Sequence, residues 1–537
     1  MKSALEVTSN PAHIQYEEYE KVCAQLNDSQ TQVQSLQQQV DWFKRQLFGR
    51  KSEKLIVDNP DQAHLFGSAQ DENVAHTPKK LVKGYTRSTK QKNENNVNDT
   101  GLRFTDEVPT KVIDVPCPEL EGEDALHYKV IGTKETHRLA QLPGSYQVLI
   151  YRQQVLKQKD NNNILSPVAP VNVLEGTYAD VSVIAGLMVD KAVYHLPLHR
   201  QHLRMLQSGV TLSRATLINY VSQGIELLTP IAKAMLHNII SGSHISMDET
   251  PMKAGRQTST RRSSSRNTHK AMKQTYFWPI YGEQDEVAFT WSSSRGKQHA
   301  LEQLSGFNGT LLSDGYAVYS QVIDVLNSQG QHITHAACWA HTRRYFEKAL
   351  DYHSKEAQYA LTEIQKLYKV EAHIRKHALN AEDTVNYRLK HSEPIITALF
   401  SWIYEQRQRP ELLPKDPLTK AFVYAYERHH ELKTYLTHAQ VSIDTNHLER
   451  ALRVVPMGRK NHLFCWSELG AQQLGVLHSL TVTCKLHNIN PYHYLVDVLQ
   501  RVSQHPARDV IDLTPRRWKV LFADKRLRSD VERDVTP

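Results

Sequence analysis

The stretch His244-Ile-Ser-Met-Asp-Glu-Thr-Pro251 decides the fold that this sequence predicts. An apolar run typical of a β-strand ends there on two acidic residues, and Thr250-Pro251 is expected to stop the strand because proline donates no ladder hydrogen bond. A strand that ends in this way places a carboxylate at the edge of a sheet. Strand alternation turns only one of the two acids inward, and we favour Asp248 over Glu249.

Two later stretches repeat the association of an apolar segment with an acid. Thr310-Leu-Leu-Ser-Asp-Gly-Tyr316 predicts a strand that delivers Asp314, and Gly315 permits a sharp exit. Asp444-Thr-Asn-His-Leu-Glu-Arg450 places Glu449 at the start of a basic helix. Carboxylates at the ends of neighbouring strands converge on one edge of a sheet, and hard divalent cations take such oxygen ligands. The pattern therefore predicts a metal site.

Simpler interpretations of these acids stay open on the sequence alone. Asp314 could be an ordinary Asp-Gly turn residue. Asn446 and Glu449 have the spacing of a capping box, in which Glu449 would cap its own helix and Asp444 would be the substitute ligand.

Length and composition indicate a multidomain α/β protein of a reducing compartment. The 537 residues are too many for one core, and no uninterrupted apolar run is long enough to predict a membrane span or a signal peptide. The five cysteines are scattered and odd in number, which favours a cytoplasmic setting. The net charge of +8 fits a polyanionic partner without requiring one.

The first hundred residues predict a dimerisation helix and a linker. Apolar residues recur at 3-4 spacing from Tyr19 to Leu47, and only Ser29 interrupts them, so we expect a coiled coil within 1–55 that joins two copies of the chain. A single amphipathic helix packed on its own domain is the alternative. Residues 56–104 are basic and polar with few aliphatic residues, as in a solvated linker.

The next two segments predict a small β-rich module and a helical region. Alternating stretches such as Ser145–Tyr151 suggest strands within 105–172. Within 173–240, helices over Leu198–Gln207 and Ser213–Val221, joined by a turn at Gly209, resemble a helix-turn-helix. Many helical hairpins share this outline, so DNA contact there is a hypothesis. The basic residues expected to make it are Arg200, Arg204 and Arg214.

The remainder predicts a catalytic core divided by a helical insertion. Strands at Tyr276–Tyr281 and Glu286–Trp291 and a helix over Lys297–Leu304 precede the Asp314 strand, which gives the β-β-β-α-β order of a ribonuclease-H-like mixed sheet over 241–345. Residues 346–440 read as an all-α insertion, 441–502 as the second part of the core, and 503–537 as a charged, peripheral tail. Before the second strand, a mobile basic loop is expected to hold a nucleic-acid backbone through residues that include Arg261, Arg262 and Arg266.

Several stretches, taken together and in order, resemble the IS-sixty-six group of bacterial insertion-sequence transposases, which belongs to the acidic-triad (DDE) class. The resemblance covers nearly the whole chain. It rests on the stretches Phe48-Gly-Arg-Lys-Ser-Glu-Lys54, Tyr194-His-Leu-Pro-Leu-His-Arg200, Leu212-Ser-Arg-Ala-Thr216, Asp248-Glu-Thr-Pro251, Asp314-Gly-Tyr316, Cys338-Trp-Ala-His341 with Arg343 and Arg344, Asn446-His-Leu-Glu-Arg450 and Gly458-Arg-Lys-Asn461.

The resemblance implies a mechanism and residue roles. Asp248, Asp314 and Glu449 would hold two Mg²⁺ or Mn²⁺ ions about 3.5–4 Å apart, with Asp248 bridging. Water would first cut at the element end, and the freed 3′-hydroxyl would then attack target DNA. Further phosphate contacts are expected from Arg343, Arg344, Arg450, Arg459 and Lys460, although Arg450 could instead pair with a carboxylate and orient it.

The cysteines depart from the pattern of the family. Its members usually carry a four-cysteine zinc module before the catalytic part, of which only Cys117 remains, so we expect no zinc there. Cys338 and His341 have metal-ligand spacing, but two ligands do not make a site, and a structural role beside the active site is favoured.

The implied partners are the terminal repeats of the element, target DNA, a second copy of the chain and, in related elements, small accessory proteins. The expected location is the cytoplasm of a bacterium, at the nucleoid. A metal-dependent nuclease that cuts without joining is the alternative within the same fold. A catalytically inactive, domesticated DNA-binding relative is the alternative from another class.

Overall fold

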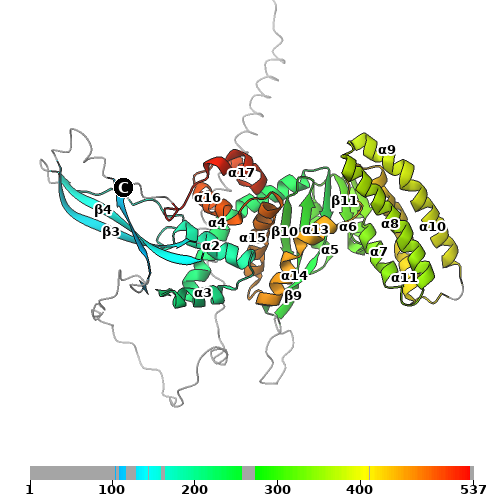
Figure 1. The fold of residues 1–537 in the computed structure, drawn as a ribbon, viewed down its shortest axis with the longest axis horizontal. Helices are drawn as coiled ribbons and strands as arrows, with labels where there is room; N and C mark the ends of the chain where they lie inside the picture. Colours follow the sequence, from blue (N-terminus) through cyan, green and yellow to red (C-terminus); the bar gives the residue numbers. More distant parts are fainter. Residues whose placement is uncertain are drawn as a thin grey trace, which may run out of the picture. The chain divides into compact units, whose positions relative to one another are not determined.

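The computed structural model describes residues 103–104, 108–116, 128–142, 144–158, 164–167, 169–256, 272–409 and 412–532 (Figure 1). The chain divides into the units Met1–Ser52 and Glu53–Pro537, and all described residues belong to the second. The predicted coiled coil, nearly all of the linker, Cys117 and the loop residues Arg261, Arg262 and Arg266 lie outside the described residues. The described part is a mixed α/β structure, as predicted.

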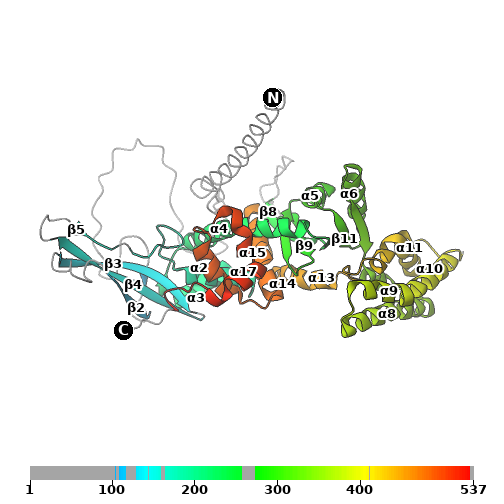
Figure 2. The ribbon, with the colours of Figure 1, turned by 90° about the horizontal axis from the view of Figure 1, so that it is seen from above.

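The β-rich module is a sheet built on one long hairpin (Figure 2). Strands β3 (Tyr128–Leu142) and β4 (Ser145–Gln158) pair antiparallel, and Gly144 makes their turn with a φ of +89°. Strands β2 (Thr110–Val115) and β5 (Ile164–Leu165) pair with β4. The strand predicted from Ser145 to Tyr151 is therefore confirmed and continues to Gln158.

The segment after residue 503 corrects the prediction of a peripheral tail. It forms η5 (Ala507–Leu513), α17 (Pro515–Leu521) and η6 (Ala523–Lys525), in which Leu513 and Trp518 are buried. Val531 joins the core of the β-rich module, and the Tyr151 hydroxyl donates to Asp530 Oδ2 at 2.6 Å. The prediction failed because a few apolar anchors are dispersed among many charged residues, which dominate the composition.

Three helices, α2 (Val181–Ala192), α3 (Leu198–Gln207) and α4 (Arg214–Ile240), form the helical region. Helix α3 has the predicted bounds, and the Ser213 hydroxyl caps α4 by accepting from the Thr216 amide at 3.0 Å. Helix α4 extends far beyond the predicted end at Val221 because buried apolar residues continue at helical spacing to Ile239. The turn between α3 and α4 contains β6 (Val210–Thr211), which pairs with β1 (Arg103–Phe104).

The central sheet has the strand order β10-β9-β7-β11-β12, with β8 paired to β9. Its strands are β7 (His244–Met247), β8 (Thr250–Arg256), β9 (Met272–Gly282), β10 (Val287–Ser292), β11 (Gly309–Ser313) and β12 (Ile333–Ala337). Strands β7, β11 and β12 run parallel, whereas β9 is antiparallel to its neighbours β7, β8 and β10. Helices α5 (Lys297–Leu304) and α6 (Ala317–Ser328) connect β10 to β11 and β11 to β12.

The residues Thr250-Pro251 do not end strand structure, contrary to prediction. The break is confined to Asp248 and Glu249, and the chain resumes at once as β8, in which Pro251 pairs with Tyr276. Strand β8 pairs with β9 alone within the sheet, and proline is tolerated in such edge strands.

Helices α13 (Asn446–Leu452), α14 (Val454–His462), α15 (Glu468–Leu486) and α16 (Pro491–Arg501) follow the insertion. Helix α15 covers the outer edge of the sheet. Its Ser479 and Thr483 hydroxyls accept hydrogen bonds from the β10 amides of Phe289 and Val287, at 2.8 and 3.1 Å. These bonds satisfy amides that an open edge strand would leave unpaired.

Every regular element in the described part of the insertion is helical, as predicted. Helix α7 (Trp339–Glu347) leads into it, and it contains α8 (Ser354–His377), α9 (Ala381–His391), α10 (Glu393–Arg407), α11 (Pro417–Glu427), α12 (His429–Lys433) and η4 (Thr434–Leu436). Their buried core includes Leu312, Ala336 and Ala337 of the central sheet, so the insertion packs directly on β11 and β12. Within the described ranges no helix is long and apolar enough to cross a bilayer.

Candidate functional site

Two of the predicted acids leave the central sheet at the same edge. Asp248 follows β7 directly and Asp314 follows β11 directly. These strands are parallel neighbours in which Ser246 pairs with Leu312, so the two acids occupy equivalent positions past the strand ends. Their backbone positions follow from the pairing register of the two strands.

The charges of three neighbouring acids act on Asp248. The pKa of its carboxyl is raised to about 8, mainly by burial, with the negative charges of Asp314, Glu249 and Glu449 adding to the effect. The Glu249 amide donates to Asp248 Oδ1 at 2.7 Å and opposes this shift. A carboxyl pKa this high indicates a buried site at which several negative charges lie close together.

Glu249 faces protein partners in place of the other acids. Its side chain is only 2% exposed, and its carboxylate accepts from Arg295 Nε at 2.8 Å and from the Tyr319 hydroxyl at 2.9 Å. The Arg295 guanidinium in turn lies 4.0 Å from the centroid of the Tyr316 ring. Sequence reasoning missed Arg295 and Tyr319, because neither lies in a motif that marks it as a partner of an acid.

Asp314 does serve the turn that follows it, since its Oδ1 accepts from the Tyr316 amide at 3.0 Å. The simple turn interpretation is thus correct for one oxygen of this carboxylate. It does not exclude a ligand role, because a carboxylate has lone pairs for several partners.

Glu449 lies on α13 and is held by a cation from α7. Arg344 Nη2 donates to Glu449 Oε1 at 2.7 Å and also contacts Oε2, and His341 Nε2 lies 3.8 Å from Oε1. The capping-box alternative fails, because Asn446 is already inside the helix and the N-cap residue, Thr445, makes no side-chain cap bond.

Asp444, the alternative third ligand, is occupied by local hydrogen bonds. Its Oδ1 accepts from the Asn446 amide at 3.0 Å. Its Oδ2 accepts from Asn446 Nδ2 at 2.6 Å and from the Tyr368 hydroxyl at 2.9 Å. These bonds fix the start of α13, which carries Glu449, so Asp444 has a structural task near the site.

Cys338, the N-cap residue of α7, and His341 within α7 lie beside the acids. The amide and hydroxyl of Thr445 both donate to Cys338 Sγ at 3.3 Å, and burial raises the pKa of the thiol to about 11. Burial lowers the pKa of His341, and the charges of Asp314 and Glu449 act in the opposite direction. The protonated, hydrogen-bonded thiol fits a structural contact between the N-caps of α7 and α13.

The donor set suits a hard divalent cation, since it consists of carboxylates, and the charges of Asp314 and Glu449 add to the raised pKa of Asp248. Among the residues that the structure describes, no group of three or more His, Cys, Asp or Glu side chains is arranged to hold a metal ion. The Glu449 carboxylate is engaged by its ion pair with Arg344.

Some of the residues predicted to contact DNA are exposed, whereas others already bind protein groups. Arg200 and Arg214 are exposed, and both act on His199, where burial is the main cause that lowers the pKa and their charges add to it. Arg450 and Lys460 are exposed as well. Four residues are engaged: Arg204 with Asp190 and the Tyr146 hydroxyl, Arg343 with Glu347, Arg344 with Glu449, and Arg459 with the Pro251 carbonyl.

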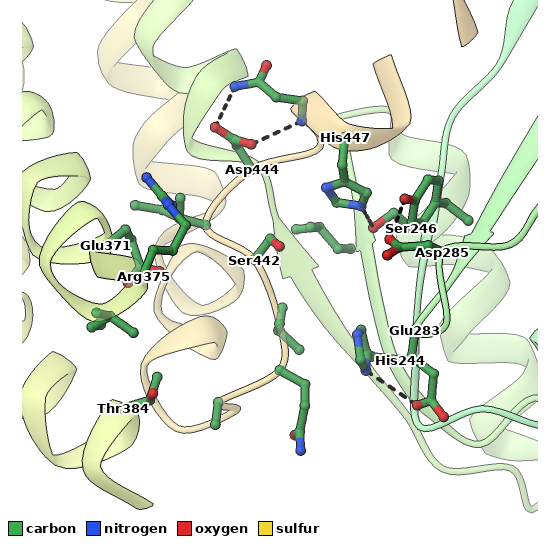
Figure 3. A pocket seen from close by; sticks show the side chains of 18 of the residues that line it. His244, Ser246, Glu283, Asp285, Glu371, Arg375, Thr384, Ser442, Asp444 and His447 are labelled. Atoms are coloured by element: carbon green, nitrogen blue, oxygen red, sulfur yellow. Dashed lines mark hydrogen bonds and ion pairs between the residues drawn. The ribbon is translucent and has the colours of Figure 1, made fainter. Parts of the chain in front are cut away.

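A separate pocket of about 800 Å³ lies between β7, α8, α9 and the segment 439–447 (Figure 3). Asp444 and His447 line one part of it, and His244 and Glu283 line another. His447 Nε2 and the hydroxyl of Ser246, which also lines the pocket, are 2.9 Å apart. Asp248, Asp314 and Glu449 are not among its lining residues, so the acids and this pocket are distinct features.

Comparison with known proteins identifies the family. The family model described as "Transposase IS66 family" matches residues 176–473. Models described as "IS66 C-terminal element" and "Transposase C of IS166 homeodomain" match residues 479–516 and 35–96. Because the first match covers more than half of the chain, the protein belongs to the IS66 family of transposases.

The similar curated proteins come from Sinorhizobium fredii and carry no assigned function. Uncharacterized protein y4qI is 27% identical over 425 residues, which cover 76% of both chains. Uncharacterized protein y4jD is 29% identical over 370 residues, covering 67% of this chain and 70% of its own. Among solved structures, a chain of the Drosophila P element transposase strand transfer complex matches with a TM-score of 0.29 and 11% identity, over 59% of this chain and 93% of that chain.

Proposed function

We propose that this chain is the transposase of a bacterial insertion sequence, an enzyme that cuts and rejoins DNA strands with divalent metal ions held by Asp248, Asp314 and Glu449. Membership of the family supplies the class of protein. One observation carries the assignment of the acids: burial and the charges of Asp314, Glu249 and Glu449 raise the pKa of the Asp248 carboxyl to about 8. Bringing like charges together costs free energy, which a bound cation would repay.

We also propose that the central sheet is a ribonuclease-H-like core. Three parallel strands, β7, β11 and β12, lie beside antiparallel β9 and β10, and helices connect the later strands. Acids that directly follow β7 and β11, with a third acid on the later helix α13, fit this assignment.

The bound Mg²⁺ or Mn²⁺ ions would activate the attacking oxygen and stabilise the leaving oxygen. Asp248 is the candidate to face both ions, because the charges of Asp314 and Glu449 both act on its carboxyl. Glu449 can join only if the Arg344 guanidinium shares or releases its carboxylate. Glu249 would stay outside the metal shell, because Arg295 and Tyr319 hold its oxygens.

The proposed partners are the terminal repeats of the element and target DNA. Exposed Arg200 and Arg214, whose charges both act on His199, and Arg450 and Lys460, near Glu449 in sequence, are the cations available for phosphates. Self-association through the amino-terminal coiled coil, small accessory proteins and a cytoplasmic, nucleoid-associated location complete the proposal. They rest on the sequence pattern and on the family.

Cleavage of labelled DNA from the ends that flank the gene, in Mg²⁺ or Mn²⁺, tests this proposal. Nicked and joined products are expected from the wild type and should be lost in Asp248→Asn, Asp314→Asn and Glu449→Gln. Cutting without joining would instead indicate a nuclease. DNA binding with no metal-dependent cutting would indicate an inactive relative.

A further inference from the structure

The helical insertion contacts the turn that carries Asp314 through one arginine. Arg428, which follows α11, donates from Nη2 to the Gly315 carbonyl at 2.7 Å. Its Nη1 donates to the Tyr424 carbonyl at 3.0 Å, and its guanidinium lies 4.2 Å from the centroid of the Tyr424 ring. One side chain thus joins α11 to the residue next to Asp314.

The Tyr424 ring is clamped from its other side by α7. It stacks on the Tyr345 ring with 4.2 Å between centroids and 20° between planes. Tyr424 is 9% exposed. The ring therefore has little freedom to move, and Arg428 rests on a fixed surface.

Gly315 packs so closely against Tyr424 and Arg428 that no side chain fits there. A Cβ atom there would lie 2.4 Å from Tyr424 Cε2, 2.5 Å from Tyr424 Oη and 2.6 Å from Arg428 Nε. Its φ lies outside the left-handed region, so the requirement for glycine is one of space. The turn and the insertion are in contact at the backbone of the residue after the acid.

A second hydrogen-bonded route reaches the residue before the acid. The Thr434 hydroxyl of η4 donates to the His335 carbonyl at 2.8 Å, and His335 Nε2 is 2.8 Å from the Ser313 hydroxyl. Asp314 is therefore flanked on both sides by residues that the insertion supports.

We infer that the helical insertion positions Asp314 for metal binding, with Arg428 and Tyr424 as the positioning residues. The inference rests on the proposed function and goes beyond it, because it assigns a task to a segment that otherwise only separates two acids in the sequence. A metal ligand must be held to within a fraction of an ångström by its supporting shell, and both routes supply such support.

The insertion offers a matched control for Arg428. The Arg407 guanidinium lies 4.1 Å from the centroid of the Tyr426 ring, which is the same kind of contact between α10 and α11. Loss of Arg407 should therefore cost the insertion a comparable contact while leaving the Asp314 turn untouched.

The test compares full-length Arg428→Ala and Arg407→Ala in two measurements, Mn²⁺ affinity by calorimetry and DNA-end cleavage across a range of Mg²⁺ concentrations. We expect Arg428→Ala to need about tenfold more metal, the effect of losing a hydrogen bond from a charged donor, and to recover much of its rate at saturating metal. Arg407→Ala should match the wild type in both. Gly315→Ala, which pushes Tyr424 and Arg428 away, should resemble Arg428→Ala.

Equal metal dependence for Arg428→Ala and Arg407→Ala would overturn this inference but not the proposed function, since the acids would then bind metal without help from the insertion. A loss of activity in Arg428→Ala that saturating metal does not change would also overturn it, because it would indicate a general structural defect. A wild type that binds no metal at the acids would overturn this inference together with the proposed function. The two failures are therefore distinguishable.

Discussion

At the residue scale, Asp248 and Glu249 are neighbours in sequence with opposite surroundings. Asp248 faces other acids, whereas Glu249 is paired with Arg295 and Tyr319. Alternation along the strand favoured Asp248 as the inward ligand, yet the Glu249 side chain is only 2% exposed, so it also points into the protein. The partners of Glu249 could not be predicted, because Arg295 and Tyr319 are 46 and 70 positions away along the chain.

Asp248→Asn should stabilise the metal-free protein at high pH. The folded pKa, about 8, lies above the unfolded value near 4, so the folded state binds the extra proton and loses stability as the pH rises from about 4 to 8. The amide cannot ionise and avoids this cost, which is on the order of a few kcal/mol. Melting temperatures in EDTA at pH 6 and pH 9 should show the variant gaining most at pH 9.

The neighbouring variant Glu249→Gln is the control for this prediction and should gain less than Asp248→Asn at pH 9. Burial raises the pKa of Glu249 as well, but the hydrogen bonds from Arg295 and Tyr319 oppose that shift, and the amide would lose the charged pair with Arg295. If Asp248→Asn were no more stable than the wild type at pH 9, burial and the neighbouring acids would not raise the pKa of Asp248.

At the scale of elements, helices with a capping serine or a clear apolar period were predicted well, as α3 and the start of α4 show. The length of α4 was not predicted, because polar residues interrupt the row of buried apolar residues that continues to Ile239. The roles of cations were equally hard to predict. Arg200 and Arg204 are one helical turn apart on α3, yet one is exposed and the other is paired.

Arg200→Ala and Arg204→Ala should therefore separate DNA binding from stability. Arg204 joins α3 to Asp190 of α2 and to Tyr146 of β4, so its loss should cost about 1 kcal/mol of unfolding free energy, a small value because the side chain is partly exposed. Arg200→Ala should leave stability unchanged, weaken DNA-end binding, and lower the slope of log affinity against log salt by about 1. Titrations at several salt concentrations and thermal melts would distinguish them. Equal effects of the two variants on DNA binding would contradict this division.

Helix α15 contains a histidine that should make the protein acid-sensitive. Burial lowers the pKa of His478 to about 3, and neither ring nitrogen has a hydrogen-bond partner. Because the folded pKa lies below the unfolded value near 6.5, its contribution to stability is present above pH 6.5 and is lost as the pH falls. The leucine in His478→Leu cannot take up this proton. Between pH 7 and 5.5 the wild type should lose about 1 kcal/mol more than the variant, as measured by urea unfolding.

At the scale of the whole molecule, the described carboxyl-terminal residues complete the fold. Trp518 is 3% exposed and its indole donates to Asp497 Oδ1 at 2.8 Å, whereas Val520, two residues later, is 82% exposed. The many charged residues after position 503 predicted a peripheral tail. A few buried apolar residues such as Trp518 hardly change the average composition of that segment, so they did not reveal its packing. The helical insertion and the strands of the central sheet other than β8, by contrast, could be predicted because apolar periodicity persists over whole elements.

Trp518→Ala should accordingly destabilise the chain by about 3–5 kcal/mol, the usual cost of removing a buried tryptophan. Val520→Ala, its control on the same helix, should change the unfolding free energy by less than about 0.5 kcal/mol. Chemical denaturation of both variants measures the difference. A mild effect of Trp518→Ala would mean that residues after 503 dock only weakly.

The central claim is that Asp248, Asp314 and Glu449 together hold the catalytic metal ions, with Asp444 outside the site. The most direct measurement is the Mn²⁺ stoichiometry and affinity of the full chain on its DNA end, compared between Glu449→Gln and Asp444→Asn. We predict two bound ions in the wild type, loss or strong weakening of at least one in Glu449→Gln, and near-normal binding in Asp444→Asn. Normal binding in Glu449→Gln with loss in Asp444→Asn would contradict the account and move the third ligand to Asp444.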